Sequence, residues 1–277
     1  MRTVTNIAEV RHWREAVSGS LGLVPTMGCL HEGHLSLVRR ARAENNVVAA
    51  TVFVNTTQFG PDEDLARYPR NLPRDQRILA EAGCDLLFAP PADEMYPPGF
   101  ETVVEAGSVA APLEGRCRPG HFRGVATIVI KLLGIVQPTH AYFGLKDAQQ
   151  LAVIRRVVRD LEVPVEIVAC PTVREANGLA MSSRNSYLNE EERRVAPVLH
   201  SALVAARDRF ATGERCAEAL RQTMRQVLAT EVLARADYVS VADPVSLREM
   251  ENISGDALLS MAVHIGRVRL IDSMLVG

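Results

Sequence analysis

Short apolar runs alternate with amphipathic stretches through residues 20–180, and this alternation constrains the fold more than any other feature of the chain. Helical stretches that alternate with apolar strands are typical of a parallel sheet covered by helices. The predicted strands are 21–25, 47–55, 84–90, 140–144 and 163–170, and the predicted helices are 33–44, 72–83 and 146–162. Residues 124–136 are apolar on every side, so their length favours a buried helix, although their β-branched content leaves a strand open. We therefore expect an α/β fold.

The character of the sequence changes after residue 189. Two stretches rich in Ala, Arg and Glu have helical periodicity, and three apolar stretches after them are predicted as strands: 191–210 and 215–229, then 236–243, 257–266 and 267–275. Helices followed by strands, without strand–helix–strand alternation, indicate a separate and smaller α+β domain. We expect domains at residues 1–182 and 183–277.

The composition excludes several classes of partner and location. With a formal net charge of −2, the 277-residue chain offers no general attraction to nucleic acid or to an anionic membrane. Residues 124–136 are too few to span a bilayer and include Lys131, and the charged N-terminus is unlike a signal peptide. Five scattered cysteines without a CxxC pair indicate reduced thiols. We expect a cytoplasmic protein with no nucleic-acid or membrane partner.

The stretch PTMGCLHEGHLSLV, residues 25–38, places His31 and His34 just after the first predicted strand. A zinc site of the HExxH type needs a different spacing, and no third ligand is apparent. Two histidines satisfied by local hydrogen bonds remain an alternative. An anion site fits the position better, because a helix N-terminus presents unpaired N–H groups and the positive end of the helix dipole. Histidines at i and i+3 there lie on one face and can stabilise charge on a phosphoryl group.

Two more distant segments carry groups suited to phosphates. Ser182 and Ser183 precede Arg184 in a predicted loop, and a guanidinium can bind two phosphate oxygens at once. Lys146 and Asp147 begin a predicted helix after the strand at 140–144, and open α/β sheets bind ligands at such strand ends. Taken alone, the first segment is better interpreted as an ordinary turn, and a solvated surface lysine explains the second equally well. The combination of these groups with the histidines is a much more specific sign of phosphate binding than any one of them.

Five segments together resemble the pantothenate synthetase (pantoate–β-alanine ligase) family: PTMGCLHEGHLSLV, FVNTTQFGPDEDLARYPR, RPGHFRGVATIVIKLL, YFGLKDAQQL and PTVREANGLAMSSRN. The HxGH and MSxR-type motifs are shared by a wider nucleotidyltransferase superfamily, whereas the FVNxxQF, HFxGV and TVREANGLAMSSRN patterns narrow the resemblance to this member. The resemblance implies a Rossmann-like catalytic domain over 1–182, a C-terminal α+β lid over 183–277, and a homodimer. It also implies a reaction in which ATP and pantoate form pantoyl adenylate and pyrophosphate. β-Alanine then attacks the acyl carbon, giving pantothenate and AMP.

The resemblance assigns roles residue by residue. The expected catalytic residues are His31, His34, Lys146, Ser182 and Arg184. The expected ATP-binding residues are Pro25, Thr26, Met27, His34, Gly144, Lys146, Asp147, Met181, Ser182, Ser183 and Arg184. The expected pantoate-binding residues are Met27, Asn55, Gln58, Tyr68 and Gln150, where the amides can read hydroxyl and carboxylate oxygens without adding charge. Mg²⁺ is expected to bind mainly through ATP phosphates, with Asp75 as a candidate helper and no protein metal site.

The chain departs from the family pattern at two positions. Thr56 stands where proline is usual, which leaves the backbone before Gln58 less constrained. Leu145 stands where Glu or Gln is expected before the lysine, so no polar side-chain role is expected at this position. His121, in PGHFRG, matches the pattern, and either a chemical role or a structural role near the pocket remains open.

Three other functions compete with this interpretation. Another HxGH nucleotidyltransferase would join a nucleotide to a phosphorylated acceptor, and its acceptor pocket would be richer in Arg or Lys than one containing Gln58 and Gln150. A tRNA synthetase is disfavoured by the short chain and the lack of a basic face. A non-catalytic ATP-binding regulator would have no need to keep both His31 and His34.

Overall fold

The structure is a computed structural model that describes residues 1–61 and 63–277. By their internal contacts these residues form two compact units, and each unit is assembled from more than one segment. The first unit consists of Met1–Gly107, Arg118–Gly144 and Val153–Cys170. The second consists of Ser108–Cys117, Leu145–Ala152 and Pro171–Gly277. The expected division cuts the chain once, at residue 182, whereas the second of these units also includes two short segments from earlier in the sequence.

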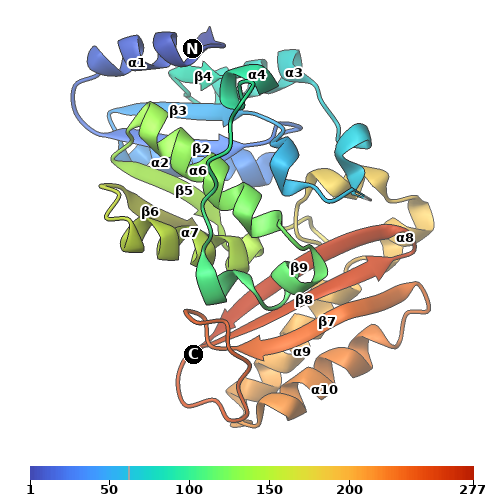
Figure 1. The fold of residues 1–277 in the computed structure, drawn as a ribbon. Helices are drawn as coiled ribbons and strands as arrows, with labels where there is room; N and C mark the ends of the chain where they lie inside the picture. Colours follow the sequence, from blue (N-terminus) through green and yellow to red (C-terminus); the bar gives the residue numbers. More distant parts are fainter. Residues whose placement is uncertain (62) are drawn as a thin grey trace. The chain divides into compact units, whose positions relative to one another are not determined.

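The first unit contains a six-stranded, entirely parallel sheet with the strand order β1-β4-β3-β2-β5-β6 (Figure 1). The strands are β1 (Arg2–Val4), β2 (Leu21–Thr26), β3 (Val47–Val52), β4 (Leu86–Phe88), β5 (His140–Gly144) and β6 (Glu166–Cys170). This confirms the predicted α/β fold. The order reverses between β2 and β5, and ligands of open parallel sheets bind at the carboxyl ends of the strands beside such a reversal. The segment that follows β2 contains both histidines.

The helices of the first unit are α1 (Ile7–Glu15), α2 (Glu32–Glu44), α3 (Leu72–Glu81), α4 (Ala92–Met95), α6 (His121–Val136) and the part of α7 (Ala148–Asp160) that begins at Val153. The ambiguous apolar stretch at 124–136 lies within α6, which confirms the helix over the strand. Most of its residues are buried, and its β-branched side chains pack in the interior rather than in a sheet. Strand β2 is equally buried, with Leu21, Leu23 and Val24 fully inaccessible. A core of this kind holds the end of β2 rigidly.

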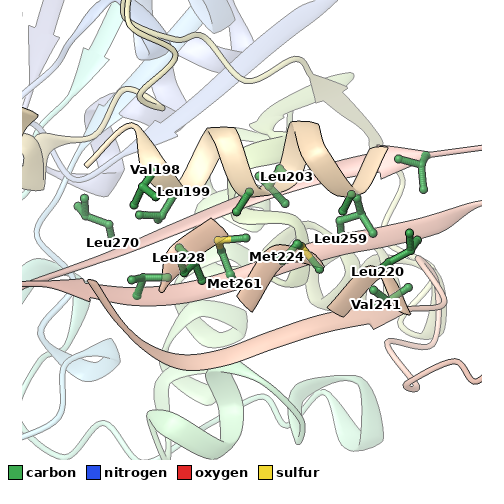
Figure 2. Packing of buried hydrophobic residues seen from close by; sticks show 14 of the residues in the cluster. Val198, Leu199, Leu203, Leu220, Met224, Leu228, Val241, Leu259, Met261 and Leu270 are labelled. Carbon is green, nitrogen blue, oxygen red and sulfur yellow. The ribbon is translucent and has the colours of Figure 1, made fainter. Parts of the chain in front are cut away.

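The second unit contains an antiparallel sheet in the order β7-β8-β9, which confirms the predicted C-terminal α+β fold. Its strands are β7 (Ala234–Ala242), β8 (Ala257–Ile265) and β9 (Val268–Val276), and its helices include α5 (Glu114–Cys117), α8 (Glu190–Val195), α9 (Val198–Ala211) and α10 (Ala217–Leu228). Figure 2 shows Leu203 of α9 and Met224 of α10 packed with Leu259 of β8 in one apolar cluster. The amphipathic helices are stabilised by burying these faces.

Short 3₁₀ helices carry several of the expected site residues. They are η1 (Thr56–Gln58), η2 (Asp64–Arg67), η3 (Gly107–Ala110), η4 (Leu145–Asp147) and η5 (Ser183–Tyr187). Within the described residues, no helix is both long enough and apolar enough to cross a membrane.

Because of His200 in α9, we predict that the stability of the second unit depends on pH. A side chain at Gly178 would place its Cβ 2.3 Å from Nδ1 of His200, so the backbone lies directly against the ring. Burial lowers the pKa of His200, and the nearby Arg174 lowers it further. The unfolded chain therefore binds the proton first, and stability falls as pH drops below the ordinary histidine pKa of about 6.5. Urea midpoints at neutral and mildly acidic pH should show a smaller decrease for His200→Gln than for the wild type; equal decreases would contradict this prediction.

Candidate active site

The segment between β2 and α2 is a tight turn with backbone conformations that few residue types adopt. Gly28 and Cys29 both have left-handed dihedrals, with φ of 84° and 49°. A Cβ on Gly28 would lie 3.0 Å from Val52 Cγ1, so glycine suits both the conformation and the space. The hydroxyl of Thr26 accepts a hydrogen bond from the N–H of Gly28 and donates one to the carbonyl of Thr51. The turn is therefore attached to both β2 and β3.

A buried carboxylate holds the next part of this turn. Asp75, in the first turn of α3, is 1% exposed. Its two oxygens accept hydrogen bonds from the backbone N–H groups of Cys29 and Leu30, both at 2.9 Å. Arg74 donates to the carbonyl of Leu30 at 2.8 Å. Both oxygens of Asp75, the residue named from the sequence as a candidate magnesium helper, thus bind backbone amides in this structure.

His31 and His34 also hydrogen-bond the start of α2. The N–H of Gly33 donates to Nδ1 of His31 at 3.2 Å, and the N–H of His31 donates to Nδ1 of His34 at 3.3 Å. The two imidazoles form a capping box and their ring centroids are 4.0 Å apart. An Nδ1 that accepts a hydrogen bond carries no proton, so each neutral ring carries its hydrogen on Nε2. The local structural role uses Nδ1 and places the ring hydrogen on Nε2, so it is compatible with an anion-binding role for the same rings.

The expected pantoate residues Asn55 and Gln58 are buried in one hydrogen-bonded group with Met27. Nδ2 of Asn55 donates to Oε1 of Gln58 at 2.9 Å and to the carbonyl of Gly124 at 3.1 Å. Because a carbonyl only accepts, the second contact fixes which way the Asn55 amide points. Gln58 then presents Nε2, which lies 3.3 Å from Sδ of Met27. Gln58 is oriented as a donor.

Sequence reasoning missed Tyr96, which completes this group. Its hydroxyl donates to Oδ1 of Asn55 at 2.6 Å, and the Thr57 hydroxyl bonds the same oxygen at 3.0 Å. Burial raises the pKa of Tyr96, which keeps the phenol protonated as a donor. No signal in the sequence pointed to this role, because Tyr96 lies 41 residues from Asn55. Tyr68, another expected pantoate residue, is buried, and its ring makes a T-shaped contact with that of Phe59.

Thr56 begins the 3₁₀ helix that carries Gln58, and we expect Thr56→Pro to stabilise the protein. The first position of a helix needs no N–H, and Asn55 before it is extended, with φ −72° and ψ 104°, as a residue before proline must be. The expected gain is about 0.5–1 kcal/mol, because proline restricts the unfolded chain. Urea denaturation measures it. Thr57→Pro is the control and should be destabilising, since Thr57 lies inside the helix and bonds Asn55; a destabilised Thr56→Pro would show that the native backbone does not accept proline.

In the second unit, the 3₁₀ helix η4 carries Lys146 and Asp147. The hydroxyl of Ser273 in β9 donates to the carbonyl of Leu145 at 2.7 Å and lies 3.3 Å from that of Lys146. Leu145 therefore contributes its backbone to this attachment, which needs no polar side chain. The Lys146 side chain is 18% exposed, and its ammonium lies 3.9 Å from Asp147.

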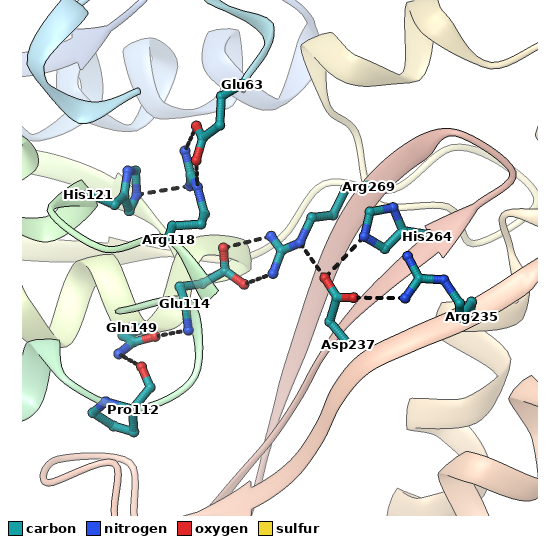
Figure 3. A network of polar contacts seen from close by, with 10 residues as sticks. All are labelled: Glu63, Pro112, Glu114, Arg118, His121, Gln149, Arg235, Asp237, His264 and Arg269. Atoms are coloured by element: carbon teal, nitrogen blue, oxygen red, sulfur yellow. Dashed lines mark hydrogen bonds and ion pairs between the residues drawn. The ribbon is translucent and has the colours of Figure 1, made fainter. Parts of the chain in front are cut away.

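The neighbouring amides Gln149 and Gln150 have different environments. Gln149 is buried, accepts the N–H of Glu114 and donates to the carbonyl of Pro112 (Figure 3). It also donates to the carbonyl of Val109. The amide of Gln149 therefore makes its hydrogen bonds within the second unit. Gln150, the expected pantoate residue, is only partly buried.

The loop with Ser182, Ser183 and Arg184 is held at both ends. Ser182 caps η5, its hydroxyl accepting the N–H of Arg184 at 3.3 Å, and the N–H of Met181 donates to the carbonyl of Val173 at 3.0 Å. Buried Asn185 donates to Glu175 and to the carbonyl of Ala180. Sequence reasoning did not single out Asn185, although it follows Arg184 directly.

The expected site residues therefore fall into two sets. The first unit holds Pro25, Thr26, Met27, His31, His34, Asn55, Gln58, Tyr68 and Gly144, and the second holds Lys146, Asp147, Gln150, Met181, Ser182, Ser183 and Arg184. Hydrogen bonds join Met27, Asn55 and Gln58 in one group, and His31 and His34 in another. Over residues 1–61 and 63–277, three or more His, Cys, Asp or Glu side chains do not gather in a group that could hold a metal ion.

Comparisons with known proteins agree on one family. The family profile described as pantoate–β-alanine ligase matches residues 2–275. A pantothenate synthetase from Roseiflexus sp. strain RS-1 is 64% identical over 273 residues, covering 99% of this chain and 98% of the relative. The crystal structure of pantothenate synthetase from Thermus thermophilus is 50% identical, with a TM-score of 0.95 over 99% of each chain.

A third similar structure is that of pantoate–β-alanine ligase from Francisella tularensis, described as complexed with β-γ ATP and β-alanine. It is 35% identical, with a TM-score of 0.82, and the match covers 99% of this chain and 97% of that one. A profile match over nearly the whole length, together with these identities, leaves one conclusion: the chain belongs to the pantoate–β-alanine ligase family.

Proposed function

We propose that this ligase joins pantoate to β-alanine in two steps at the residues described above. In the first, a carboxylate oxygen of pantoate attacks the α-phosphorus of ATP and pyrophosphate leaves. In the second, the amine of β-alanine attacks the acyl carbon, AMP leaves, and the amine loses its proton to solvent. The observation that carries this proposal is the hydrogen bond accepted by Nδ1 of both His31 and His34, which places the ring hydrogens on Nε2, in the turn that also carries Met27 against Gln58.

We assign the phosphates of ATP to hydrogen-bond donors and to positively charged side chains. His31 and His34 donate Nε2–H to charge that develops during displacement, where a preorganised donor lowers the barrier most. Lys146, Ser182 and Arg184 neutralise and bind the phosphate oxygens. The remaining ATP contacts are assigned to Pro25, Thr26, Met27, Gly144, Asp147, Met181 and Ser183.

Pantoate is assigned to residues with amide and hydroxyl groups. Gln58, oriented as a donor by Asn55, fits a hydroxyl or carboxylate oxygen of the substrate. Met27, Tyr68 and Gln150 are the other residues that we assign to pantoate. The amine step needs no strong base, because an acyl adenylate is already activated and holding the two reactants together supplies much of the rate.

The remaining features of the reaction are also proposals. The Francisella tularensis relative, described as complexed with β-γ ATP and β-alanine, supports ATP and β-alanine as substrates here. Mg²⁺ is expected to act through ATP phosphates, because it keeps water and phosphate ligands in preference to protein cages. We further propose a cytoplasmic homodimer in which residues 183–277 act as the ligand-closing part and no nucleic acid takes part.

The test is exchange of labelled pyrophosphate into ATP with pantoate present and β-alanine absent. Exchange that requires both pantoate and Mg²⁺, and that chelation abolishes and added Mg²⁺ restores, supports the adenylate step. Absence of exchange together with absence of pantothenate formation would refute the proposal. Formation of pantothenate without exchange would support the ligase activity but would reject a reversible first step that releases pyrophosphate.

A further inference from the structure

The segment that carries Gln58 is held by the first turns of α6. A Cβ on Gly124 would lie 2.5 Å from the carbonyl oxygen of Thr57 and 2.7 Å from Cα of Gln58, so helix and segment touch backbone to backbone. The carbonyl of Gly124 also accepts the hydrogen bond from Asn55. The rigidity that proline would give at position 56 is therefore supplied by contacts with α6.

His121, the first residue of α6, makes a third contact between this helix and the segment that carries Gln58. It is 8% exposed, and its Nδ1 lies 2.9 Å from the carbonyl oxygen of Gln58. On the other side of the ring, Nε2 lies 3.1 Å from Nη1 of Arg118. A carbonyl can only accept and a guanidinium can only donate, so the ring is neutral with its hydrogen on Nδ1. Both ring nitrogens are engaged, which leaves neither as a general base in this arrangement.

Arg118 is itself fixed by a carboxylate. Its Nε and Nη2 bind the two oxygens of Glu63 at 2.8 and 2.6 Å, a bidentate pair whose side chains are only 16% and 23% exposed (Figure 3). Bidentate pairs of this type restrict the guanidinium to one orientation. Glu63, Arg118 and His121 thus form a chain of contacts that ends on the backbone of Gln58.

We propose that His121 is a positioning residue for pantoate, acting through the backbone carbonyl of Gln58 and held in its working tautomer by Arg118 and Glu63. This inference rests on the proposed assignment of Gln58 to pantoate. Gln58 is fixed twice, by His121 at its backbone and by Asn55 at its side chain, and both contacts leave Nε2 as its donor. The substrate atom that it meets must then be a hydrogen-bond acceptor.

Two amide substitutions of His121 separate this role from a general structural one. The amide nitrogen of Asn can occupy the place of Nδ1 and keep the bond to Gln58, whereas the longer Gln places its amide near Nε2, toward Arg118. We expect His121→Gln to raise the KM for pantoate about tenfold, with kcat and the KM for ATP changed less than about twofold, because a buried carbonyl loses its donor. His121→Asn should return the KM for pantoate to within about threefold of wild type.

Two controls distinguish a failure of the role proposed for His121 from a failure of the assignment of Gln58 to pantoate. His12→Gln changes a histidine whose side chain is 82% exposed and should alter no parameter. In a Gln58→Ala background, His121→Gln should add nothing to the KM for pantoate, because the effect passes through Gln58. Equal losses in His121→Asn and His121→Gln, equal changes for ATP and pantoate, or a lost limb of the pH–kcat profile would overturn the proposal. If Gln58→Ala alone leaves the KM for pantoate unchanged, the assignment of Gln58 fails instead.

Discussion

His34→Ala is expected to lower pantoate-dependent exchange of pyrophosphate into ATP by about 10²–10³-fold, the usual cost of removing one preorganised donor from a developing charge. The wild-type imidazole keeps Nδ1 bound to the N–H of His31, so its Nε2–H is oriented before the substrate arrives. Binding of ATP without pantoate should weaken far less, because a transition-state interaction contributes little to the ground state.

The matched control for this prediction is His12→Ala, at a side chain that is 82% exposed. It should leave exchange and stability at wild-type values. Because His34 also accepts a backbone hydrogen bond at the start of α2, unfolding in urea must be measured on the same samples. A loss of exchange that follows only the fraction of unfolded protein would reject the chemical role, and undiminished exchange in folded His34→Ala would reject the assignment of His34 altogether.

The parts of the fold that follow from sequence are those that depend on neighbouring residues. Strand β2, the glycine turn and helix α2 are adjacent in the chain, and the hydrophobic periodicity there is unambiguous. Residues 124–136 needed their length as well as their pattern to be identified as a helix. The short strand β1 was not predicted, because three residues carry too little periodicity, and it pairs with β4 from more than eighty residues away.

The contacts that shape the candidate site are mostly invisible in the sequence. Asp75 meets Cys29 across 46 residues, Tyr96 meets Asn55 across 41, and His121 meets Gln58 across 63. Sequence patterns and the family resemblance identified candidate substrate-binding residues, because these stand in recognisable motifs. The residues that orient them come from other elements of the sheet and its helices, so only the fold reveals which donor serves which acceptor.

Asp75→Asn is expected to destabilise the protein by about 3 kcal/mol, near the upper end for an unsatisfied buried group. The carboxylate accepts from two backbone amides, at Cys29 and Leu30. Asparagine has a single acceptor oxygen, so its NH₂ group must face one of the two N–H groups, donor against donor. The isosteric change preserves packing, so the loss reports the hydrogen bonds together with the removal of a negative charge that lies 3.8 Å from Arg74.

The same substitution should also reduce catalysis beyond its effect on stability. The turn at Gly28 and Cys29 has left-handed dihedrals that strain a side chain at Cys29, and Asp75 is the group that compensates by binding the amides there. If the turn relaxes, His31 and His34 move from the geometry set by the capping box, and exchange should fall about tenfold in the folded protein. Asp93→Asn, at an exposed carboxylate in α4, should change stability by no more than about 0.5 kcal/mol. If the folded Asp75→Asn variant has wild-type stability, the amides of the turn have found other acceptors. If it loses stability but keeps wild-type exchange, the histidines hold their positions through α2 alone.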